Sequence, residues 1–178
     1  MKPLTNLRAL DNPLRVAGMS PPASSDLLII AIDPGVNGGV AWRWEGKTYA
    51  VKMPPTDFDC VALLASLAEL TTWVELYLEE PPLYAGKNIP GSAIGKLMFN
   101  TGVLYGAAIA LRFKVHRVRP AIWMKSHPVG TKGDMTTTEW KNKLKARASE
   151  LYPDGVAVTL WSADALLILD AAVRRAIT

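Results

Sequence analysis

The sequence predicts one α/β domain built on a mixed five-stranded sheet, in which three antiparallel strands precede parallel strands and helices cover both faces. The chain has 178 residues, enough for one domain with a substantial core and too few for two. Three strand-like runs come first, and segments of helical and strand periodicity then alternate. The composition, 49% hydrophobic and 20% charged, is typical of a globular protein.

The first 25 residues differ from the rest of the chain. They combine prolines with Gly, Ser and Asn and show no sustained period. Such a segment buries too little apolar surface to offset the entropy of ordering it. We therefore expect a disordered N-terminal tail over residues 1–25 and the folded domain over residues 26–178.

Five segments have the pattern of strands. The first, at 27–33, is an unbroken apolar run that suits a strand buried on both faces. Strands at 40–44 and 48–53 follow, joined by a hairpin turn at Glu45-Gly46-Lys47. A fourth strand at 73–80 is expected to run parallel to the first, and Pro81-Pro82 ends it. A fifth strand is expected at 115–119.

Four segments have helical periodicity, at 57–70, 92–111, 140–152 and 163–177. The last is largely apolar, which predicts a helix buried against the sheet. The second carries Gly102, Gly106 and Ala110 at intervals of four residues. That small-residue stripe favours close approach of another element, either inside the fold or across a dimer.

Several features exclude classes of function. Cys60 is the only cysteine, so neither an intramolecular disulfide nor a thiolate zinc site is expected. No signal-peptide pattern and no membrane-length apolar run is evident, so we expect a cytoplasmic protein without a membrane partner. The histidines His116 and His127 have no metal-ligand spacing, and we assign neither a role.

Positive charge is concentrated in one part of the chain. Ten Lys and Arg residues lie between Arg112 and Arg147, against the two acidic residues Asp134 and Glu139. A basic segment in an otherwise acidic chain is typical of a surface that binds a polyanion such as DNA. A solvated basic helix is the alternative.

Three carboxylates lie at positions where a charge is unfavourable unless it interacts with a partner. Asp33 ends the first strand, Glu79 ends the fourth, and Asp164 lies in the first turn of the apolar last helix. If the two strands are neighbours, their carboxyl ends bring Asp33 and Glu79 together. Like charges at that range favour bridging cations, and Mg²⁺ prefers oxygen ligands. Taken singly, a turn aspartate and a helix-dipole partner remain alternatives for Asp33 and Asp164.

Several short motifs between Leu27 and Ala172 resemble those of the RuvC-type Holliday junction resolvases, which are RNase H-like nucleases. The motifs are IIAIDPGVNGGVAW, YLEEPP, RVRPAIWMK and SADALLI, and KNKLKARASELYP resembles the phage-type members. The resemblance implies Mg²⁺-dependent hydrolysis of branched DNA by a homodimer, with two ions per site, Mn²⁺ as a substitute and no nucleotide cofactor. It also implies a bacteriophage origin, and hence the cytoplasm of a bacterial host.

Carried over residue by residue, the resemblance implies Asp33, Glu79 and Asp164 as metal ligands, with Glu80 as a further candidate. Lys125 and Lys141 match lysines near the scissile phosphate, where a positive charge stabilises the transition state. The aromatic Tyr84 matches one that stacks at the branch point. The residues expected to contact DNA are Tyr84, Lys87, Arg117, Arg119, Lys125, Lys132, Lys141, Lys143 and Lys145.

The sequence departs from the family at one ligand. A fourth carboxylate normally lies three or four residues before the helix aspartate, where this chain has Trp161 and Leu160. Glu80 or Asp154 are candidates to compensate, whereas Asp170 lies on another face of the helix.

Two further classes of function stay open at this stage. One is an RNase H-like module that binds branched DNA without cutting it, a class that Trp161 in the ligand position would suit. The other, ranked lower, is an ATP-binding phosphotransferase of the actin and sugar-kinase type. Its glycine-rich turn after a strand aspartate resembles DPGVNGG.

Overall fold

The structure, a computed structural model, describes residues 26–81, 90–175 and 177. The expected tail over 1–25, together with Tyr84 and Lys87, lies outside the described residues. The five strands are β1 (Leu28–Asp33), β2 (Gly39–Trp44), β3 (Lys47–Lys52), β4 (Val74–Glu79) and β5 (Lys114–Val118). The five helices are α1 (Asp57–Ala68), α2 (Gly91–Ala110), α3 (Pro120–Lys125), α4 (Thr137–Leu151) and α5 (Ala163–Val173).

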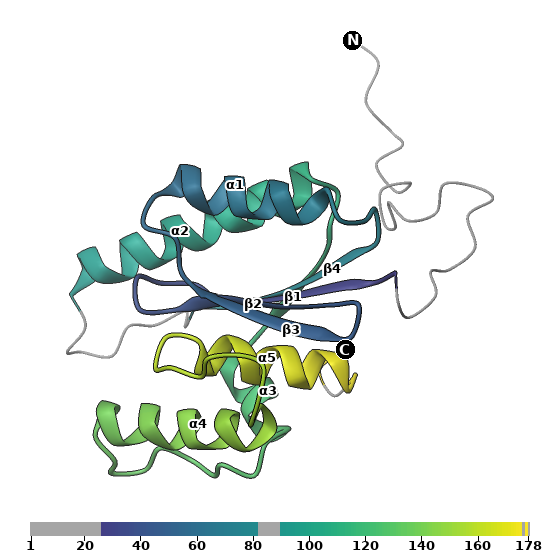
Figure 1. Cartoon of the computed structure of the whole chain (residues 1–178). Coiled ribbons are helices and arrows are strands. Elements are labelled where there is room, and N and C mark those ends of the chain that lie inside the picture. The colour runs from purple at the N-terminus through teal and green to yellow at the C-terminus, as the bar shows by residue number, and fades with distance from the viewer. Residues whose placement is uncertain (1–25, 82–89, 176, 178) are drawn as a thin grey trace, which may run out of the picture.

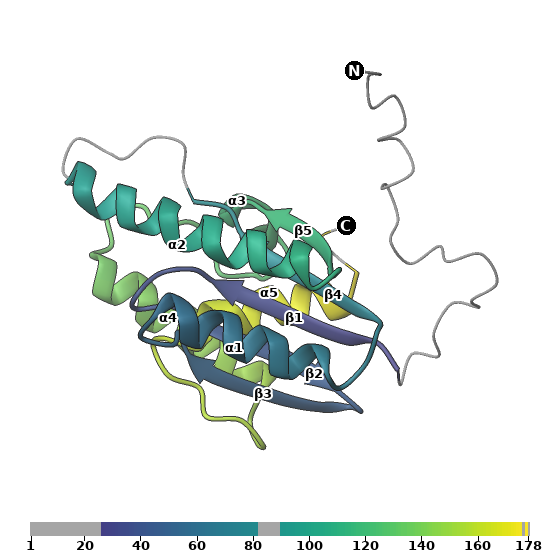
Figure 2. The same ribbon diagram turned by 90° about the horizontal axis from the view of Figure 1, so that it is seen from above.

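The strands form one mixed sheet in the order β3-β2-β1-β4-β5. The first three strands are antiparallel, and β4 and β5 continue the sheet parallel to β1. Helices α1 and α2 lie side by side on one face, as seen from above in Figure 2. On the other face α5 packs directly on the sheet, and α4 forms a further layer over α5 (Figure 1). The expected mixed α/β architecture, with helices on both faces, is confirmed.

The two faces of β1 and β4 follow directly from the alternation of their side chains. Ile30 and Ile32 belong to the core beneath α1 and α2, whereas Ala31 belongs to the core around α5. On β4, Leu76 and Leu78 face α1 and α2, and Tyr77 faces α5. Since residues two apart share a face, Asp33 and Glu79 end their strands on the side that α5 covers.

The turn between β2 and β3 is the expected hairpin. Glu45 and Gly46 both have positive φ, 48° and 76°, and Trp44 pairs with Lys47 across them. Two consecutive positive φ values are what a tight turn needs to follow the twist of the strands. The turn is therefore Glu45-Gly46, and Lys47 already belongs to β3.

Helix α5 is the centre of the second core. Nine of its eleven residues are buried, and it contacts β1, β2 and β4 on one side and α4 and α3 on the other. Small side chains at Ala31 and Ala41 on the strands allow its close approach. The first turn of α5 is thus fixed against the end of the sheet.

Three sequence-based expectations about helices differ from the structure. Helix α3 was not expected as a separate element, because its six residues are too few to show a period; Pro120 at its first turn starts it. The last helix ends at Val173 rather than 177, and Arg175 follows with a φ of 56°. Helix α4 begins three residues earlier than expected, at a capping box between Thr136 and Glu139.

Helix α2 also overturns an expectation. By length and composition alone it is long and apolar enough to cross a membrane, although no such segment was expected. In the structure it packs on α1, β4 and β5 with Leu104 and Ala108 buried, and most of its other residues are not buried. Its exposed side therefore carries apolar surface that this single chain does not cover.

We predict opposite effects of alanine at two glycines. A β-carbon at Gly38 would lie 2.0 Å from the carbonyl oxygen of Asp33, so Gly38→Ala must force the β1–β2 turn open. We expect a loss of about 2 kcal/mol in the free energy of unfolding, measured by urea denaturation. Gly95→Ala is the control: it lies inside α2 with no atom within 4 Å, and should add about 0.5–1 kcal/mol. Equal stability of the two variants would contradict the tight turn at Asp33.

Candidate active site

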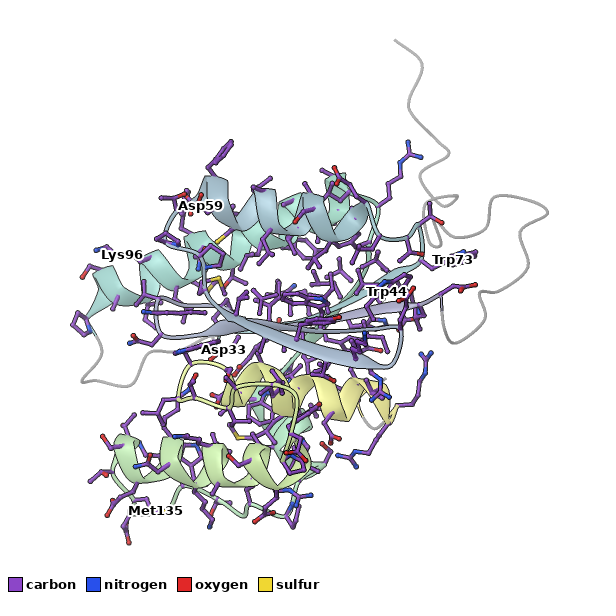
Figure 3. The ribbon with its side chains drawn as sticks, viewed as in Figure 1. Asp33, Trp44, Asp59, Trp73, Lys96 and Met135 are labelled. Atoms are coloured by element: carbon purple, nitrogen blue, oxygen red, sulfur yellow. The ribbon has the colours of Figure 1, made fainter. Side chains whose placement is uncertain are left out.

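Three acidic side chains meet at one end of the sheet. Ile32 pairs with Leu78 in the parallel register of β1 and β4, so Asp33 and Glu79 follow at the ends of adjacent strands. The first turn of α5 brings Asp164 against them, and Asp164 is 5% exposed. Figure 3 shows Asp33 at the opposite end of the sheet from Trp44 and Trp73. The predicted meeting of Asp33, Glu79 and Asp164 is what the structure contains.

Lys141 of α4 enters this cluster. Its ammonium donates to Asp164 Oδ2 and lies 3.8 Å from Asp33 Oδ2. The buried neighbours Trp140 and Leu144 fix this turn of α4 against the α5 core. A lysine that was predicted to lie near a phosphate thus lies among the carboxylates themselves.

The proximity of the carboxylates changes their protonation. Burial and the charge of Asp164 raise the pKa of Asp33 to about 7, against the opposing effect of Lys141. Burial, followed by the charges of Asp33 and Asp164, raises the pKa of Glu79 well above its ordinary value. Burial alone would lower the pKa of Lys141, but the surrounding carboxylates raise it. The raised pKa values mean that Asp33 and Glu79 retain protons more readily, because one ammonium does not offset the burial and mutual repulsion of the carboxylates.

Two oxygens of the cluster have no hydrogen-bond partner. They are Glu79 Oε2 and Asp164 Oδ1, both buried. An unsatisfied buried carboxylate oxygen is costly unless a donor or a cation meets it. Hard oxygen donors of this kind fit a divalent ion such as Mg²⁺. Among the described residues no three acidic, His or Cys side chains already surround one point as metal ligands do, and the Lys141 ammonium lies between Asp33 and Asp164 instead.

Helix α3 supplies a neighbour of Glu79. The Trp123 side chain is completely buried beside Glu79, and its indole nitrogen and Glu79 Oε2 both lack a hydrogen-bond partner among the described residues. Trp123 was not predicted as a site residue because α3 itself was not recognised from the sequence. The available signal was the segment RVRPAIWMK, where Pro120 starts a turn that carries an apolar ring.

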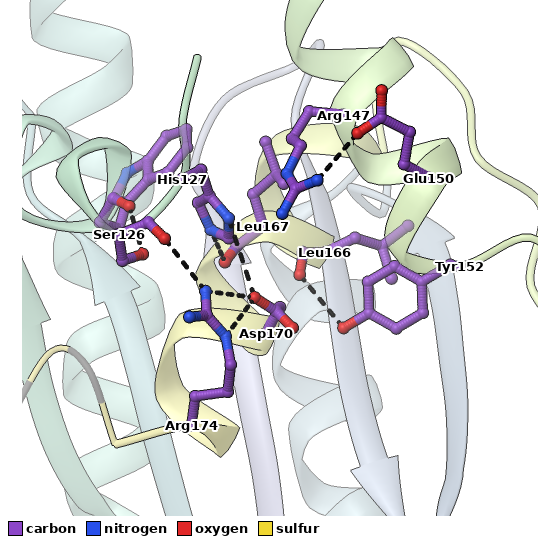
Figure 4. Close-up of polar contacts among 10 residues, drawn as sticks. Ser126, His127, Arg147, Glu150, Tyr152, Leu166, Leu167, Asp170 and Arg174 are labelled. Atoms are coloured by element: carbon purple, nitrogen blue, oxygen red, sulfur yellow. Dashed lines mark hydrogen bonds and ion pairs between the residues drawn. The ribbon is translucent and has the colours of Figure 1, made fainter. Parts of the chain in front are cut away.

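A polar network holds α3 on α5 (Figure 4). His127 is buried and its Nε2 donates to the carbonyl of Leu167 at 2.9 Å, with its Nδ1 3.8 Å from Asp170. Arg174 binds both Asp170 and the carbonyl of Ser126. Burial lowers the pKa of His127, so this histidine is a neutral structural link. Asp170 belongs to this link and not to the carboxylate cluster.

A groove of about 1170 Å³ opens onto Asp33 and Lys141. Its walls are the β1–β2 turn, the β3–α1 connection and the first half of α2. Lys52 and Lys96 add positive charge, and Val36 and Phe99 expose large apolar surfaces along it. Asp33 and Lys96 lie at the same end of the molecule (Figure 3). Asp33 and Lys141, on one side of the carboxylate cluster, therefore line a groove of mixed apolar and basic character, whereas Glu79 and Asp164 lie behind them.

Glu80 does not join the cluster. Its carboxylate pairs with Arg117 at 2.6 Å and Arg119 at 3.5 Å, both on the β5 side of β4. The residue after Glu79 must turn away from the α5 face because strand side chains alternate. Glu80 thus orients two of the predicted DNA-contacting arginines rather than completing a metal site.

The other predicted contact residues surround α3 and α4. Lys125 and Lys143 are exposed, and Lys145 is half-buried. Lys132 donates to Thr137 at 3.1 Å. The predicted compensating residue Asp154 is exposed and has no contact with the cluster among those described. The basic side chains thus line the layer that carries Lys141, next to the carboxylates.

The fold is RNase H-like, and three acidic side chains meet at one end of its sheet. No protein-family model and no curated protein sequence matches the chain. Among solved structures, T. thermophilus RuvC in complex with a Holliday junction substrate is similar, with a TM-score of 0.55 and 15% identity over 85% of this chain and 98% of that chain. A second Thermus thermophilus RuvC structure gives 0.53 and 16%, covering 85% and 99%. The chain has the RuvC-type fold that its motifs predicted.

We predict that Asp33→Asn stabilises the metal-free protein at alkaline pH. Asp33 has a folded pKa of about 7 against an ordinary value of 3.8, so its favourable contribution is present below about pH 4 and lost as the pH rises through 7. A neutral amide avoids that loss, and we expect a gain of about 1–2 kcal/mol at pH 8 that shrinks toward pH 5. Urea denaturation in EDTA measures it.

The exposed Asp154→Asn is the matched control and should leave the pH profile unchanged. An Asp33→Asn protein that is less stable than the wild type at pH 8 would show that Lys141 already compensates the Asp33 charge.

Proposed function

We propose that this protein is a structure-selective endonuclease that cuts four-way or other branched DNA by metal-dependent phosphodiester hydrolysis. One observation carries the proposal: carboxylates from β1, β4 and α5 converge with unpartnered oxygens at the solvent-accessible end of the sheet. Support for the substrate comes from the RuvC-type fold, since one similar structure is bound to a Holliday junction. We further propose that the protein acts in the cytoplasm of a bacterial host and is encoded by a bacteriophage.

We assign Asp33, Glu79 and Asp164 as the ligands of Mg²⁺, with Mn²⁺ as a substitute. When bound, the ion supplies the Lewis acidity that phosphodiester hydrolysis requires. Trp123 lies beside the Glu79 carboxylate, and the buried first turn of α5 fixes Asp164. Lys141 lies within reach of a phosphate placed on the cluster and offsets the charge that develops there.

The DNA is proposed to lie along the basic layer beside the cluster. The exposed lysines of α3 and α4 contact phosphates, and Arg117 of β5 and Arg119 at the start of α3 continue this surface. Phosphate contacts position the duplex without reading its sequence. Recognition of the branch then depends on shape, which suits a structure-selective enzyme.

One departure from the sequence pattern of the family favours a second function. No carboxylate stands at 160 or 161, where Leu160 and Trp161 lie. A site with fewer ligands binds metal more weakly, and a protein that binds branched DNA without cutting it is the corresponding alternative. The assay that tests the first function separates the two.

We expect paired nicks in a labelled synthetic four-way junction in Mg²⁺, and none in linear duplex of the same sequence or in EDTA. Asp33→Asn should reduce cutting by at least about 100-fold while junction binding stays intact, because the fold is kept and only a ligand charge is lost. Asp154→Asn is the control that should cut normally. Gel analysis of cleavage and binding gives both quantities. Tight binding without any cutting would favour the non-enzymatic alternative, and an active Asp33→Asn enzyme would disprove the ligand assignment.

We propose in addition that two copies associate through the exposed side of α2. Gly102 and Gly106 face open space, since a β-carbon added at either glycine would have no atom within 4 Å. Phe99, Tyr105 and Ile109 expose apolar surface beside them. A stripe of glycines between large apolar side chains allows two helices to approach closely. The expected homodimer would place two carboxylate sites on one junction.

Gly106→Arg should convert the dimer into a monomer, because the side chain fills the stripe with a charged group. Light scattering after size-exclusion chromatography measures the mass. Val61→Arg, on the exposed side of α1, is the matched control and should remain dimeric. A wild-type protein that elutes as a monomer at micromolar concentration would refute the α2 interface.

A further inference from the structure

The number of metal ions in the site follows from the position of Lys141. Its ammonium contacts Asp164 Oδ2 and lies 3.8 Å from Asp33 Oδ2, so it bridges two of the three proposed ligands. A second divalent ion would bridge carboxylates in the same way. Lys141 thus already occupies the kind of position that a second cation needs.

Lys141 is held there by its helix. The capping box at Thr136 and Glu139 starts α4 one turn before it, and the adjacent Trp140 is buried in the α5 core. Its side chain is 32% exposed, so the ammonium is only partly hydrated. A partly buried ammonium that leaves two carboxylates must regain its hydration elsewhere, which favours its staying in place.

The charges of the cluster balance with one ion. Metal binding requires the three carboxylates to be ionised, and together with one ammonium they then carry a formal charge of about −2, which a single divalent ion neutralises. A second divalent ion would add two positive charges a few ångströms from both the first ion and Lys141. In a partly buried site that repulsion is large.

We propose that the site of the free protein holds one divalent ion per chain, bound by Asp33, Glu79 and Asp164, with the Lys141 ammonium serving as the second cation. The proposal rests on the assignment of this cluster as the metal site of the proposed nuclease. It replaces the expectation of two ions that the family resemblance implied. Lys141 is on this account a built-in counterion that sets the metal stoichiometry.

The test is a Mn²⁺ titration of the DNA-free protein at pH 8, with free Mn²⁺ followed by its electron paramagnetic resonance signal. The wild type should bind one ion per chain. Lys141→Met and Lys141→Gln, which remove the ammonium, should bind two, and the first ion should bind about tenfold more tightly. Lys141→Arg keeps the charge and is the control that should still bind one. Circular dichroism verifies that each variant is folded.

The outcomes separate this inference from the proposed function. Two ions in the wild type, or one in both Lys141→Met and Lys141→Gln, would overturn the role of Lys141 while leaving a metal-dependent nuclease intact. No bound Mn²⁺ in the wild type would overturn both. Junction cutting in Mg²⁺ is measured independently, so a correct stoichiometry without cutting would reject the nuclease and keep the site.

Discussion

The repulsion among Asp33, Glu79 and Asp164 is the constraint on which the rest of this structure depends. Three carboxylates are brought together from two strands and a helix, and one lysine offsets only part of their charge. Such an arrangement opposes folding, so the surrounding elements must impose it. Parallel pairing of β1 with β4 fixes two of the carboxylates, and the almost fully buried α5 fixes the third. The two hydrophobic cores therefore stabilise the fold enough to offset the repulsion among the three carboxylates.

Glu75 and Glu79 lie four residues apart on the same face of β4, and the groups that surround their carboxylates can be compared directly. Glu75 receives hydrogen bonds from Tyr77 and Lys114, and His116 and Arg175 lie beside it. Its partners, His116 foremost, lower its pKa, whereas burial and like charges raise that of Glu79. A buried carboxylate with a structural role is thus surrounded by donors from its own chain. Glu79 has no such donors, which is the physical reason for proposing that it binds a metal ion.

The sequence predicted the part of the site that depends on local pattern. Strand ends and parallel order were sufficient to bring Asp33 and Glu79 together, and the apolar periodicity of the last helix placed Asp164. Strand alternation also explains why Glu80 faces β5 instead. The position of Lys141 between two carboxylates depends on how α4 packs across α5, a long-range contact that no local pattern encodes. Trp123 was missed for a related reason, since a helix as short as α3 has no period to detect.

Leu160 and Trp161, which stand where the family resemblance implied a carboxylate, have a physical explanation when Lys141 is considered with them. The carboxylate that the resemblance implied at these positions is absent, which leaves the cluster less negative, and an ammonium between Asp33 and Asp164 changes its charge in the same direction. Both changes reduce the demand for external cations, so they suit each other in one site. Trp161 meanwhile packs closely on Gly39, the strand partner of Asp33, and so holds the backbone from which the Asp33 side chain projects. Trp161 therefore contributes packing close to the place where Lys141 supplies positive charge.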